Sequence, residues 1–462
     1  MGPAITLGAR EDSAVAGRCA RSAEAVHGGA PLSTDRFPRW YAHRRRAHRF
    51  HVGRIPFDAL DGWTFEPGTG NLAHRSGGFF RVEGLHVTGA PGPVPHWQQP
   101  VIVQPDAGIL GILAKEFDGV LHFLLQAKME PGNPRLVQLS PTVQATRSNY
   151  TGMHRGAAVP YLDHFTGRRP GRVLTDSLQS EHGSWFLRKA NRNTVVETDE
   201  DIPVHQDFRW FTLAQIGALL RLDNLVNMDT RSVLACLPTG DPDHGALHSD
   251  MRLLSWLTDE RAARHTLRAE RTPLARVARW TGGEYAIDHA EGRYFRVVAV
   301  QVEAGNREVG RWSQPLFEPI GQGVTAFLVR RFGGVPHLLV RARDGEGGAA
   351  SVELGPTVQA TPGNYAHLPE AARPPFLRTV LDAAPGRVLY DVVHSEEGGR
   401  FLGARSRCLF VEAGAHEAPA EPPPGFFWAT PNQINTLLGH SGYVNVQART
   451  LLSALTTRAV VL

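Results

Sequence analysis

The 462-residue sequence contains only three cysteines, Cys19, Cys236 and Cys408. They lie far apart and form no Cys-x-x-Cys pair, which excludes a disulfide scaffold and a zinc site built from cysteines, and indicates a reducing, cytoplasmic location. No apolar run approaches the roughly 20 residues that span a bilayer, so no membrane segment is expected. Residues 1–36 also lack the apolar segment of a signal peptide. Their small, polar composition predicts a disordered leader.

Lysine is equally scarce, since only three of the 49 basic residues are lysines. The formal charge is +4 and the isoelectric point is about 9.1. The one dense basic run, His43–Arg49, lies beside the leader, and a solvated helix is favoured there over a nucleic-acid surface. Arginine can hold phosphate through two parallel hydrogen bonds, so a small phosphorylated ligand remains open. No nucleic-acid partner is expected.

One polar string occurs twice, as SPTVQATRSNY at 140–150 and as GPTVQATPGNY at 355–365. The same offset of 215 residues also aligns WQQP with WSQP, and one GRVL string with another. After a small insertion, an offset of 218 residues aligns Trp210 with Trp428. A period this long indicates duplicated domains rather than a solenoid, whose repeats run about 20–50 residues. We therefore predict a first repeat over 37–240, a linker with a helix over 241–270, and a second repeat over 271–462.

Each repeat begins with segments of strand character and ends with a helix. Segments 79–87 and 294–302 alternate between apolar and polar residues, as strands do. Thr212 precedes apolar residues at helical spacing and is the expected N-cap. Thr430 is its counterpart, followed by Pro431 at the first helical position. This order predicts an α+β fold, with a mixed sheet flanked by helices, rather than a doubly wound sheet.

The repeated PTVQAT string places its polar residues on one face of a strand, because alternate side chains point the same way. Thr142, Gln144 and Thr146 share that face. It is either the wall of a polar pocket or the solvated face of a half-buried sheet, and the retention of every polar residue in both copies favours the pocket. Asn149 and Tyr150 follow, where loop residues are free to reach a ligand.

A Ser-Glu-x-Gly turn recurs as QSEHG at 179–183 and as HSEEG at 394–398. The turn places a carboxylate, Glu181 or Glu396, beside a tight bend, where it is either a general base or simply solvated. Only the first copy then continues with several basic and amide side chains. They suit a diphosphate, or they form a solvated strand face. They are Arg188, Lys189, Asn191, Arg192 and Asn193.

Trp97 and Trp312 occupy matching positions before the repeated proline, and either stack on a nucleobase or pack in a core. Several motifs are absent. The sequence contains no Walker A string, no complete G-x-G-x-x-G and no G-x-S-x-G. Nothing in it requires a metal, a nicotinamide or a flavin, and no cofactor is expected.

Several strings of the sequence, taken together, resemble the NDP-hexose 2,3-dehydratases. In the first copy they are WQQP, VQLSPTVQATRSNY, QSEHGSWFLRKANRN and FRWFTLAQIGALLRLDNLVNMDTRSVLACLP, and in the second copy HSEEGGRFL and YVNVQARTLL. The resemblance covers nearly all of the chain after the leader. It implies a duplicated Nudix-like α/β/α domain, a homodimer, a dTDP-linked 4-keto-6-deoxyhexose as substrate, and two nucleotide-sugar pockets per chain. The Nudix box that holds Mg²⁺ in the hydrolases is missing, which favours dehydration. The product would pass to a 3-ketoreductase.

This chemistry requires a base for the hydrogen on carbon 3, an acid for the hydroxyl that leaves carbon 2, and donors for the enolate oxygen. By residue type, Glu181 is the expected base, and Tyr150 or His182 the acid. The expected substrate-binding residues are Trp97, Gln144, Thr146, Asn149, Arg188, Lys189, Arg192 and Asn193. The expected second pocket comprises Trp312, Gln359, Thr361, Asn364, Tyr365, Glu396 and Arg400. Two alternatives stay open: a Nudix-type nucleotide-sugar hydrolase and a non-catalytic nucleotide-sugar binding module.

Overall fold

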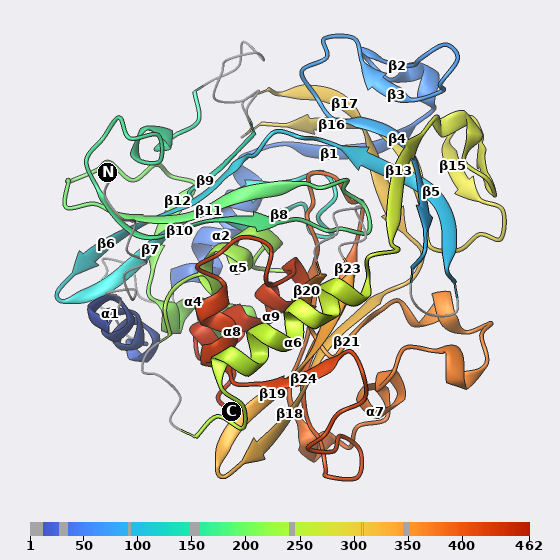
Figure 1. Ribbon diagram of the computed structural model, residues 1–462. Coiled ribbons are helices and arrows are strands. Elements are labelled where there is room, and N and C mark those ends of the chain that lie inside the picture. Colours follow the sequence, from blue (N-terminus) through green and yellow to red (C-terminus); the bar gives the residue numbers. More distant parts are fainter. Residues whose placement is uncertain are drawn as a thin grey trace, which may run out of the picture.

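The computed structural model describes residues 13–26, 36–90, 94–146, 158–239, 245–305, 307, 309–344 and 352–462. Helices and mixed sheets form two repeated halves, which confirms the predicted α+β class and the duplication (Figure 1). Each half contributes a five-stranded and a seven-stranded sheet. One apolar cluster runs through both halves and includes Ile112 and Phe123 of the first and Phe327 and Phe410 of the second. The halves therefore share a core.

The seven-stranded sheet of the first half has the order β10-β11-β6-β7-β12, with β9 paired to β6 and β8 to β7. Strands β6 and β11 run parallel, and the other pairs are antiparallel. Apolar residues dominate β6 and β7 because both faces of these central strands are covered. The strands are β6 (Ile109–Phe117), β7 (Val120–Met129), β8 (Val137–Ser140), β9 (Val143–Ala145), β10 (Arg172–Ser180), β11 (Ala190–Glu197) and β12 (Phe208–Phe211).

The second half repeats this arrangement. Its sheet has the order β20-β19-β18-β23-β22, with β21 paired to β18 and β24 to β19, and β18 is parallel to β23. The strands are β18 (Gly323–Phe332), β19 (Val335–Asp344), β20 (Val352–Gly355), β21 (Val358–Ala360), β22 (Val388–Ser395), β23 (Arg405–Glu412) and β24 (Phe426–Ala429). The short helix α7 (Leu377–Leu381) lies between β21 and β22 in the chain.

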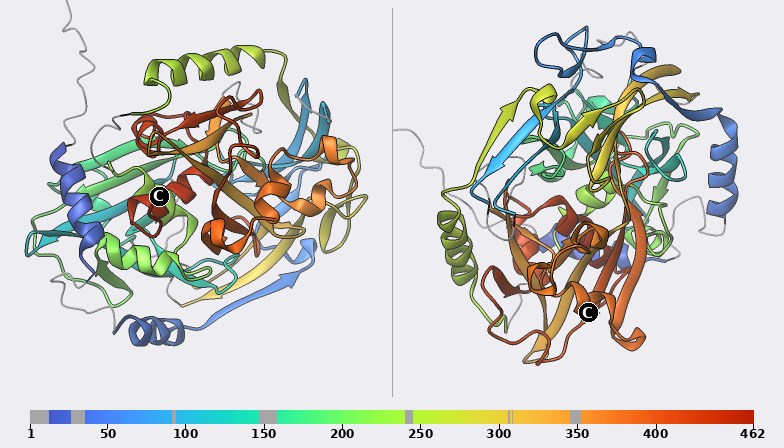
Figure 2. Two further views of the ribbon diagram at one scale, coloured as in Figure 1. Left: turned by 90° about the horizontal axis from the view of Figure 1, so that it is seen from below. Right: turned by 90° about the vertical axis from the view of Figure 1, so that its right-hand side faces the viewer.

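The two five-stranded sheets exchange strands between the halves. Strand β1 pairs with β16 of the second half, and β13, which follows the linker helix, pairs with β4 of the first half. The predicted helix of the linker is α6 (Asp250–Ala263), which lies at the periphery of the molecule (Figure 2). The strands are β1 (Phe50–Ile55), β2 (Trp63–Phe65), β3 (Leu72–His74), β4 (Arg81–Thr88), β5 (His96–Val103), β13 (Arg268–Thr272), β14 (Trp280–Gly282), β15 (Ala286–His289), β16 (Phe295–Ala304) and β17 (Arg311–Pro319).

Both predicted N-caps are confirmed. Thr212 begins α4 (Leu213–Leu220) and Thr430 begins α8 (Pro431–Leu437), each in a capping box with a glutamine three residues later. The helices that follow them, α5 (Met228–Ala235) and α9 (Val446–Thr456), contact each other across the two halves. This central helix pair brings the halves together (Figure 1). Among the described helices, none has the length and apolar character that crossing a membrane requires.

The expectation of a disordered leader is wrong for Ser13–Glu24, which forms helix α1. Val15, Cys19 and Ala23 are buried in the shared core, because small apolar residues at helical spacing provide a face that packs on α4 and β7. Arg18 also bonds to Glu116 of β6 and Glu197 of β11. The basic run lies mostly in a second helix, α2 (Phe37–Ala47).

Candidate active site

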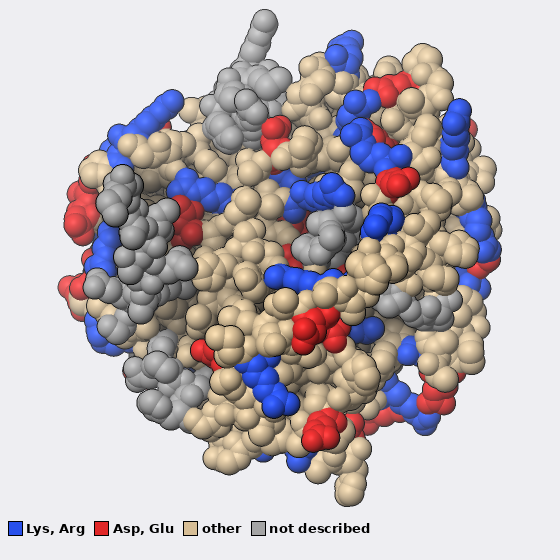
Figure 3. All heavy atoms as spheres, in the orientation of Figure 1, with Lys and Arg blue, Asp and Glu red and all other residues tan. Residues whose placement is uncertain are grey.

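A cavity of about 320 Å³ lies between the two halves. The first half provides the ends of β7, β9, β10 and β11, the loop after β5 and the start of α5, and the second half provides the start of β17 and the turn 397–400. Strand ends and turns place polar side chains at the cavity, while the sheets hold them in position. On the face of the molecule shown in Figure 3, basic and acidic side chains are interspersed.

Four carboxyl groups meet at the cavity. Glu130 follows β7, Glu181 follows β10, Asp229 lies in the first turn of α5, and Glu397 follows β22 of the second half. Glu130, Glu181 and Asp229 are buried. The sequence places each of them directly after a buried strand or at a helix start, so the fold needs no long loop to bring them together.

Hydrogen bonds hold these carboxyl groups unequally, and Glu130 also accepts one at Oε2 from Asn133 Nδ2 at 3.2 Å. Gln144 Nε2 donates to Glu130 Oε1 at 2.6 Å, and Asn191 Nδ2 donates to Glu181 Oε1 at 2.7 Å. The backbone N–H of Gly399 donates to an oxygen of Glu397 at 3.1 Å. One buried oxygen has no hydrogen-bond partner in each of three residues: Glu181 Oε2, Asp229 Oδ1 and Glu397 Oε2. An unpaired buried carboxylate oxygen is costly, which favours the neutral acid in Asp229 and Glu397.

The environment shifts several pKa values toward neutrality. Burial raises the pKa of Glu397 to about 8, and the negative charges of Glu130 and Glu181 add to this against the effect of Arg400. Burial, reinforced by Glu181, Glu130 and Glu397, also raises the pKa of Asp229 well above its usual range. Burial lowers the pKa of the Lys189 amine to about 8. The cavity thus combines proton donors and acceptors that titrate near physiological pH, the condition for acid–base catalysis.

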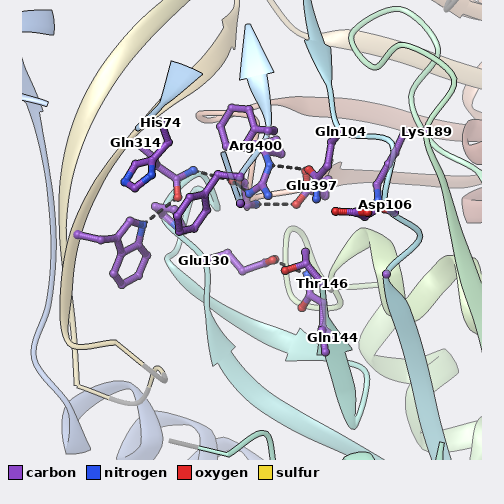
Figure 4. A pocket seen from close by; sticks show the side chains of 18 of the residues that line it. His74, Gln104, Asp106, Glu130, Gln144, Thr146, Lys189, Gln314, Glu397 and Arg400 are labelled. Carbon is purple, nitrogen blue, oxygen red and sulfur yellow. Dashed lines mark hydrogen bonds between the residues drawn. The ribbon is translucent and has the colours of Figure 1, made fainter. Parts of the chain in front are cut away.

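Aromatic and cationic side chains also line the cavity, and Arg400 lies beside Glu397 (Figure 4). The Arg400 guanidinium lies 4.3 Å from the centre of the Phe80 ring, and its Nε donates to Gln104 Oε1 at 3.2 Å. The Trp312 Nε1 donates to Gln314 Oε1 at 2.8 Å. Arg307 and Arg311 stand beside this tryptophan, and Trp63, His74 and Phe79 complete the wall. Aromatic faces and guanidinium groups suit a nucleobase and a diphosphate.

Several residues predicted from the sequence meet at this cavity. Four were expected in the first pocket and two in the second. They are Gln144, Thr146, Glu181 and Lys189 from the first half, and Trp312 and Arg400 from the second. The structure therefore brings together, in one site, residues that the duplication alone assigns to two separate pockets.

His182 lies elsewhere and does not line the cavity. Its Nε2 is 2.9 Å from Glu396 Oε2, and its Nδ1 is 2.6 Å from Gln447 Nε2. Glu396 also accepts a hydrogen bond from Ser406 Oγ at 2.5 Å. Burial alone would raise the pKa of Glu396, but His182 and Ser406 outweigh it and lower that pKa. Both oxygens of Glu396 are therefore occupied, unlike those of Glu181.

The other described residues predicted in the first copy also lie outside the cavity. Arg192 pairs with Asp176 on the neighbouring strand at 2.7 Å. Arg192 therefore follows the alternative in which the basic cluster forms a strand face rather than a diphosphate site. Asn193 is buried and accepts a hydrogen bond from Ser232 Oγ at 3.0 Å. Trp97 packs in a small apolar cluster and donates to Gln99. Arg188 lies in the turn before β11, and Asn149 and Tyr150 fall outside the described residues.

The other residues predicted for the second pocket lie on and after β21. Gln359 accepts a hydrogen bond from Asn445 Nδ2 at 2.9 Å, and Asn364 accepts one from the backbone of Tyr294 at 3.3 Å. Thr361 and Tyr365 flank Asn364 along the chain. None of these residues lines the cavity described above.

Sequence reasoning missed Glu130, Asp229 and Glu397. The repeat alignment contains a usable signal, because the two copies differ at the positions of Asp229 and Glu397. By that alignment Asp229 corresponds to Gln447, and His182 corresponds to Glu397. Within the part of the chain that the structure describes, no three histidine, cysteine, aspartate or glutamate side chains are placed to hold one metal ion.

Comparison with known proteins adds an independent observation. The sequence profile of the NDP-hexose 2,3-dehydratase family matches residues 34–237 and, a second time, residues 250–455. A protein of Amycolatopsis orientalis named dTDP-4-dehydro-6-deoxy-alpha-D-glucopyranose 2,3-dehydratase is 55% identical, over 97% of this chain and 96% of its own length. Proteins of the same name from Saccharopolyspora spinosa and Streptomyces violaceoruber are each 49% identical over 92% of this chain, and over 91% and 97% of their own lengths.

Proposed function

Because the chain belongs to the NDP-hexose 2,3-dehydratase family, we propose that it converts dTDP-4-keto-6-deoxy-D-glucose to dTDP-3,4-diketo-2,6-dideoxy-D-glucose by loss of water. The observation that carries this proposal is 49–55% identity, along nearly the whole chain, to three relatives named as 2,3-dehydratases of this sugar nucleotide. The cavity supports it, since carboxyl, aromatic and guanidinium groups line it together.

In this proposal Glu181 removes the hydrogen on carbon 3, which the neighbouring carbonyl acidifies. Asn191 holds one carboxyl oxygen and leaves Oε2 for the proton. Gln144 and Thr146 bind sugar hydroxyls or the enolate oxygen, and Lys189 contributes a positive charge next to Glu181. Tyr150 and Asn149 remain candidates for the acid and for a sugar contact.

The side chains proposed to bind the nucleotide come from the second half. Trp312 offers an aromatic face for thymine, and Arg400, with Arg307 and Arg311 nearby, offers guanidinium groups for the diphosphate. We retain a second nucleotide-sugar pocket around Gln359, Thr361, Asn364, Tyr365 and Glu396. Because both oxygens of Glu396 are engaged by His182 and Ser406, this second pocket is proposed to bind rather than to catalyse.

The wider assignments follow the family. We propose that each repeat, 37–240 and 271–462, is a Nudix-like α/β/α domain, that the protein is a homodimer, and that it acts in the cytoplasm, consistent with three buried cysteines that form no disulfide. The 3,4-diketone is a reactive product, and its carbon-3 carbonyl can be reduced to a hydroxyl. A 3-ketoreductase is therefore the proposed next enzyme, in the biosynthesis of a deoxysugar for a glycosylated natural product.

The test is mass spectrometry of dTDP-4-keto-6-deoxyglucose incubated with the purified protein in EDTA, without added nicotinamide. We expect the nucleotide sugar to lose one water with wild type. Glu181→Gln should lower the rate by about 10²-fold or more, the usual contribution of a positioned base. Cleavage that requires added Mg²⁺ would instead identify a nucleotide-sugar hydrolase, and tight binding without turnover would identify a binding module.

A further inference from the structure

Glu397 reaches the cavity of the first half from a turn of the second half. The turn 397–403 docks on the turn after β7 through backbone bonds: Gly132 N–H donates to Gly398 O at 2.7 Å, and Gly403 N–H donates to Gly132 O at 2.7 Å. A Cβ atom on Gly132 would lie 1.7 Å from the carbonyl oxygen of Phe401, so only glycine permits this approach. The docking fixes Glu397 beside Glu130 and within electrostatic reach of Glu181.

We propose that Glu397 of the second half is the catalytic acid of the first-half site, protonating the hydroxyl that leaves carbon 2. The inference rests on the proposed dehydratase function and deepens it. Glu397 lines the cavity, keeps Oε2 without a hydrogen-bond partner, and shares its enclosed surroundings with Glu130, Glu181 and Asp229. The charges of Glu130 and Glu181 act on both Glu397 and Asp229, which favours the protonated form of these two groups.

Glu397 and Glu181 have different roles in the proposed reaction. Burial raises the pKa of Glu397 to about 8, so this acid holds its proton at neutral pH. Glu181 accepts a hydrogen bond from the Asn191 amide at Oε1, and its unpartnered Oε2 can take the proton from carbon 3. One group is thus arranged to give a proton and the other to take one, as an elimination requires.

The reaction balances with these two groups alone. Glu181 takes the proton from carbon 3, and the electron pair of that C–H bond forms the enolate with the carbon-4 carbonyl. The enolate then collapses to a carbon 2–carbon 3 double bond, the C2–O bond breaks, and the departing hydroxide takes the proton of Glu397 to become water. The product is a 3-hydroxy enone. Its hydroxyl proton returns to Glu397 while protonated Glu181 delivers a proton to carbon 2, giving the 3,4-diketone and restoring both groups.

The experiment separates proton removal from loss of water. Wild type, Glu397→Gln and Glu181→Gln are incubated with dTDP-4-keto-6-deoxyglucose in D₂O, and mass spectrometry follows deuterium on carbon 3 of the unreacted substrate and formation of the dehydrated product. For Glu397→Gln we expect water loss to fall about 10²-fold or more, while deuterium still enters carbon 3 because the enolate forms and returns. For Glu181→Gln both should fall.

The control is Glu412→Gln, which makes the same change at an exposed glutamate of β23 away from the cavity and should match wild type. Wild-type dehydration by Glu397→Gln would overturn the proposal, and so would equal loss of deuterium entry and of water loss in a folded variant. If Glu397→Gln does not fold, Glu397→Asp retains an acid and should show the same separation in weaker form; equal loss of both steps there would overturn the proposal. Absence of dehydration in wild type would instead refute the proposed function.

Discussion

Glu181 and Glu396 occupy equivalent positions, yet their surroundings differ. Glu396 has both oxygens hydrogen-bonded, to His182 and Ser406, whereas Glu181 keeps Oε2 unpaired. The difference arises from a few substitutions between the copies, which change the charge or the hydrogen-bonding group at each position. The pairs are Lys189 and Ala404, Asn191 and Ser406, Asp229 and Gln447, and His182 and Glu397. Single residues, not the shared fold, therefore distinguish the surroundings of Glu181 from those of Glu396.

Lys189 provides a prediction that links stability to pH. Burial lowers its pKa from 10.5 to about 8, so between these values the unfolded chain binds the proton that the folded protein has lost, and stability rises with pH. Below pH 8 both states are protonated, and the folded protein carries the full cost of the buried charge. We expect Lys189→Met to unfold with a free energy about 1–3 kcal/mol higher than wild type at pH 7, and to lose dehydratase activity.

Urea unfolding at pH 7, 8, 9 and 10 checks this. The stability difference between Lys189→Met and wild type should be largest at pH 7 and shrink as the pH rises above 8. Lys115→Met is the control, because Lys115 lies outside the cavity and is partly exposed. A difference that stays constant over this range, or a variant less stable at every pH, would contradict the assignment.

At the scale of elements, helices α5 and α9 each send a buried arginine into the other half. Arg231 of α5 donates to the carbonyl of Ser395, and Arg449 of α9 donates to the carbonyl of Ser180. Arg449 also bonds to Ser232 Oγ at 3.0 Å, next to Arg231 in the chain. Because Ser180 precedes Glu181 and Ser395 precedes the segment with Glu397, each helix positions a carboxyl group of the opposite half.

Substituting these arginines by lysine keeps the charge but removes the planar fork that makes several bonds at once. We expect Arg449→Lys to slow both deuterium entry at carbon 3 and water loss, because the strand end carrying Glu181 is released. Arg231→Lys should slow water loss more than deuterium entry, because it acts through Glu397. Thermal unfolding confirms that each variant is folded before its kinetics are compared. An identical pattern in the two variants would show that both arginines act only on stability.

At the scale of the whole molecule, the sequence predicts that the two repeats are equivalent, but not that each half contributes strands and side chains to the other. The offset of 215 residues identifies the duplication, and the Thr212 and Thr430 caps follow from local rules. The offset does not say which copy completes which site. Trp312 and Arg400 line the cavity of the first half, although their alignment suggests a separate pocket. The placement of these second-half residues in the same cavity as first-half residues depends on long-range contacts between turns and strands, which local sequence patterns do not encode.

The strand exchange leads to a prediction for the divided chain. Cutting between residues 241 and 242 leaves β13 with the second half, although it pairs with β4 of the first, and leaves β1 with the first half, although it pairs with β16. Each fragment alone would expose an unpaired sheet edge and one side of the shared core. We expect neither fragment to fold alone, but the two co-expressed fragments to purify together through a tag on one of them.

The co-purified complex should dehydrate the nucleotide sugar, because Glu181 and Glu397 come from different fragments and meet only when both are present. Combining a wild-type first fragment with a second fragment carrying Glu397→Gln should give a complex that assembles but loses water slowly. A first fragment that unfolds cooperatively as a monomer would show that β13 is dispensable for its sheet. Activity in that fragment alone would show that its cavity needs no residue from the second half, since β17 and the turn with Glu397 would both be missing.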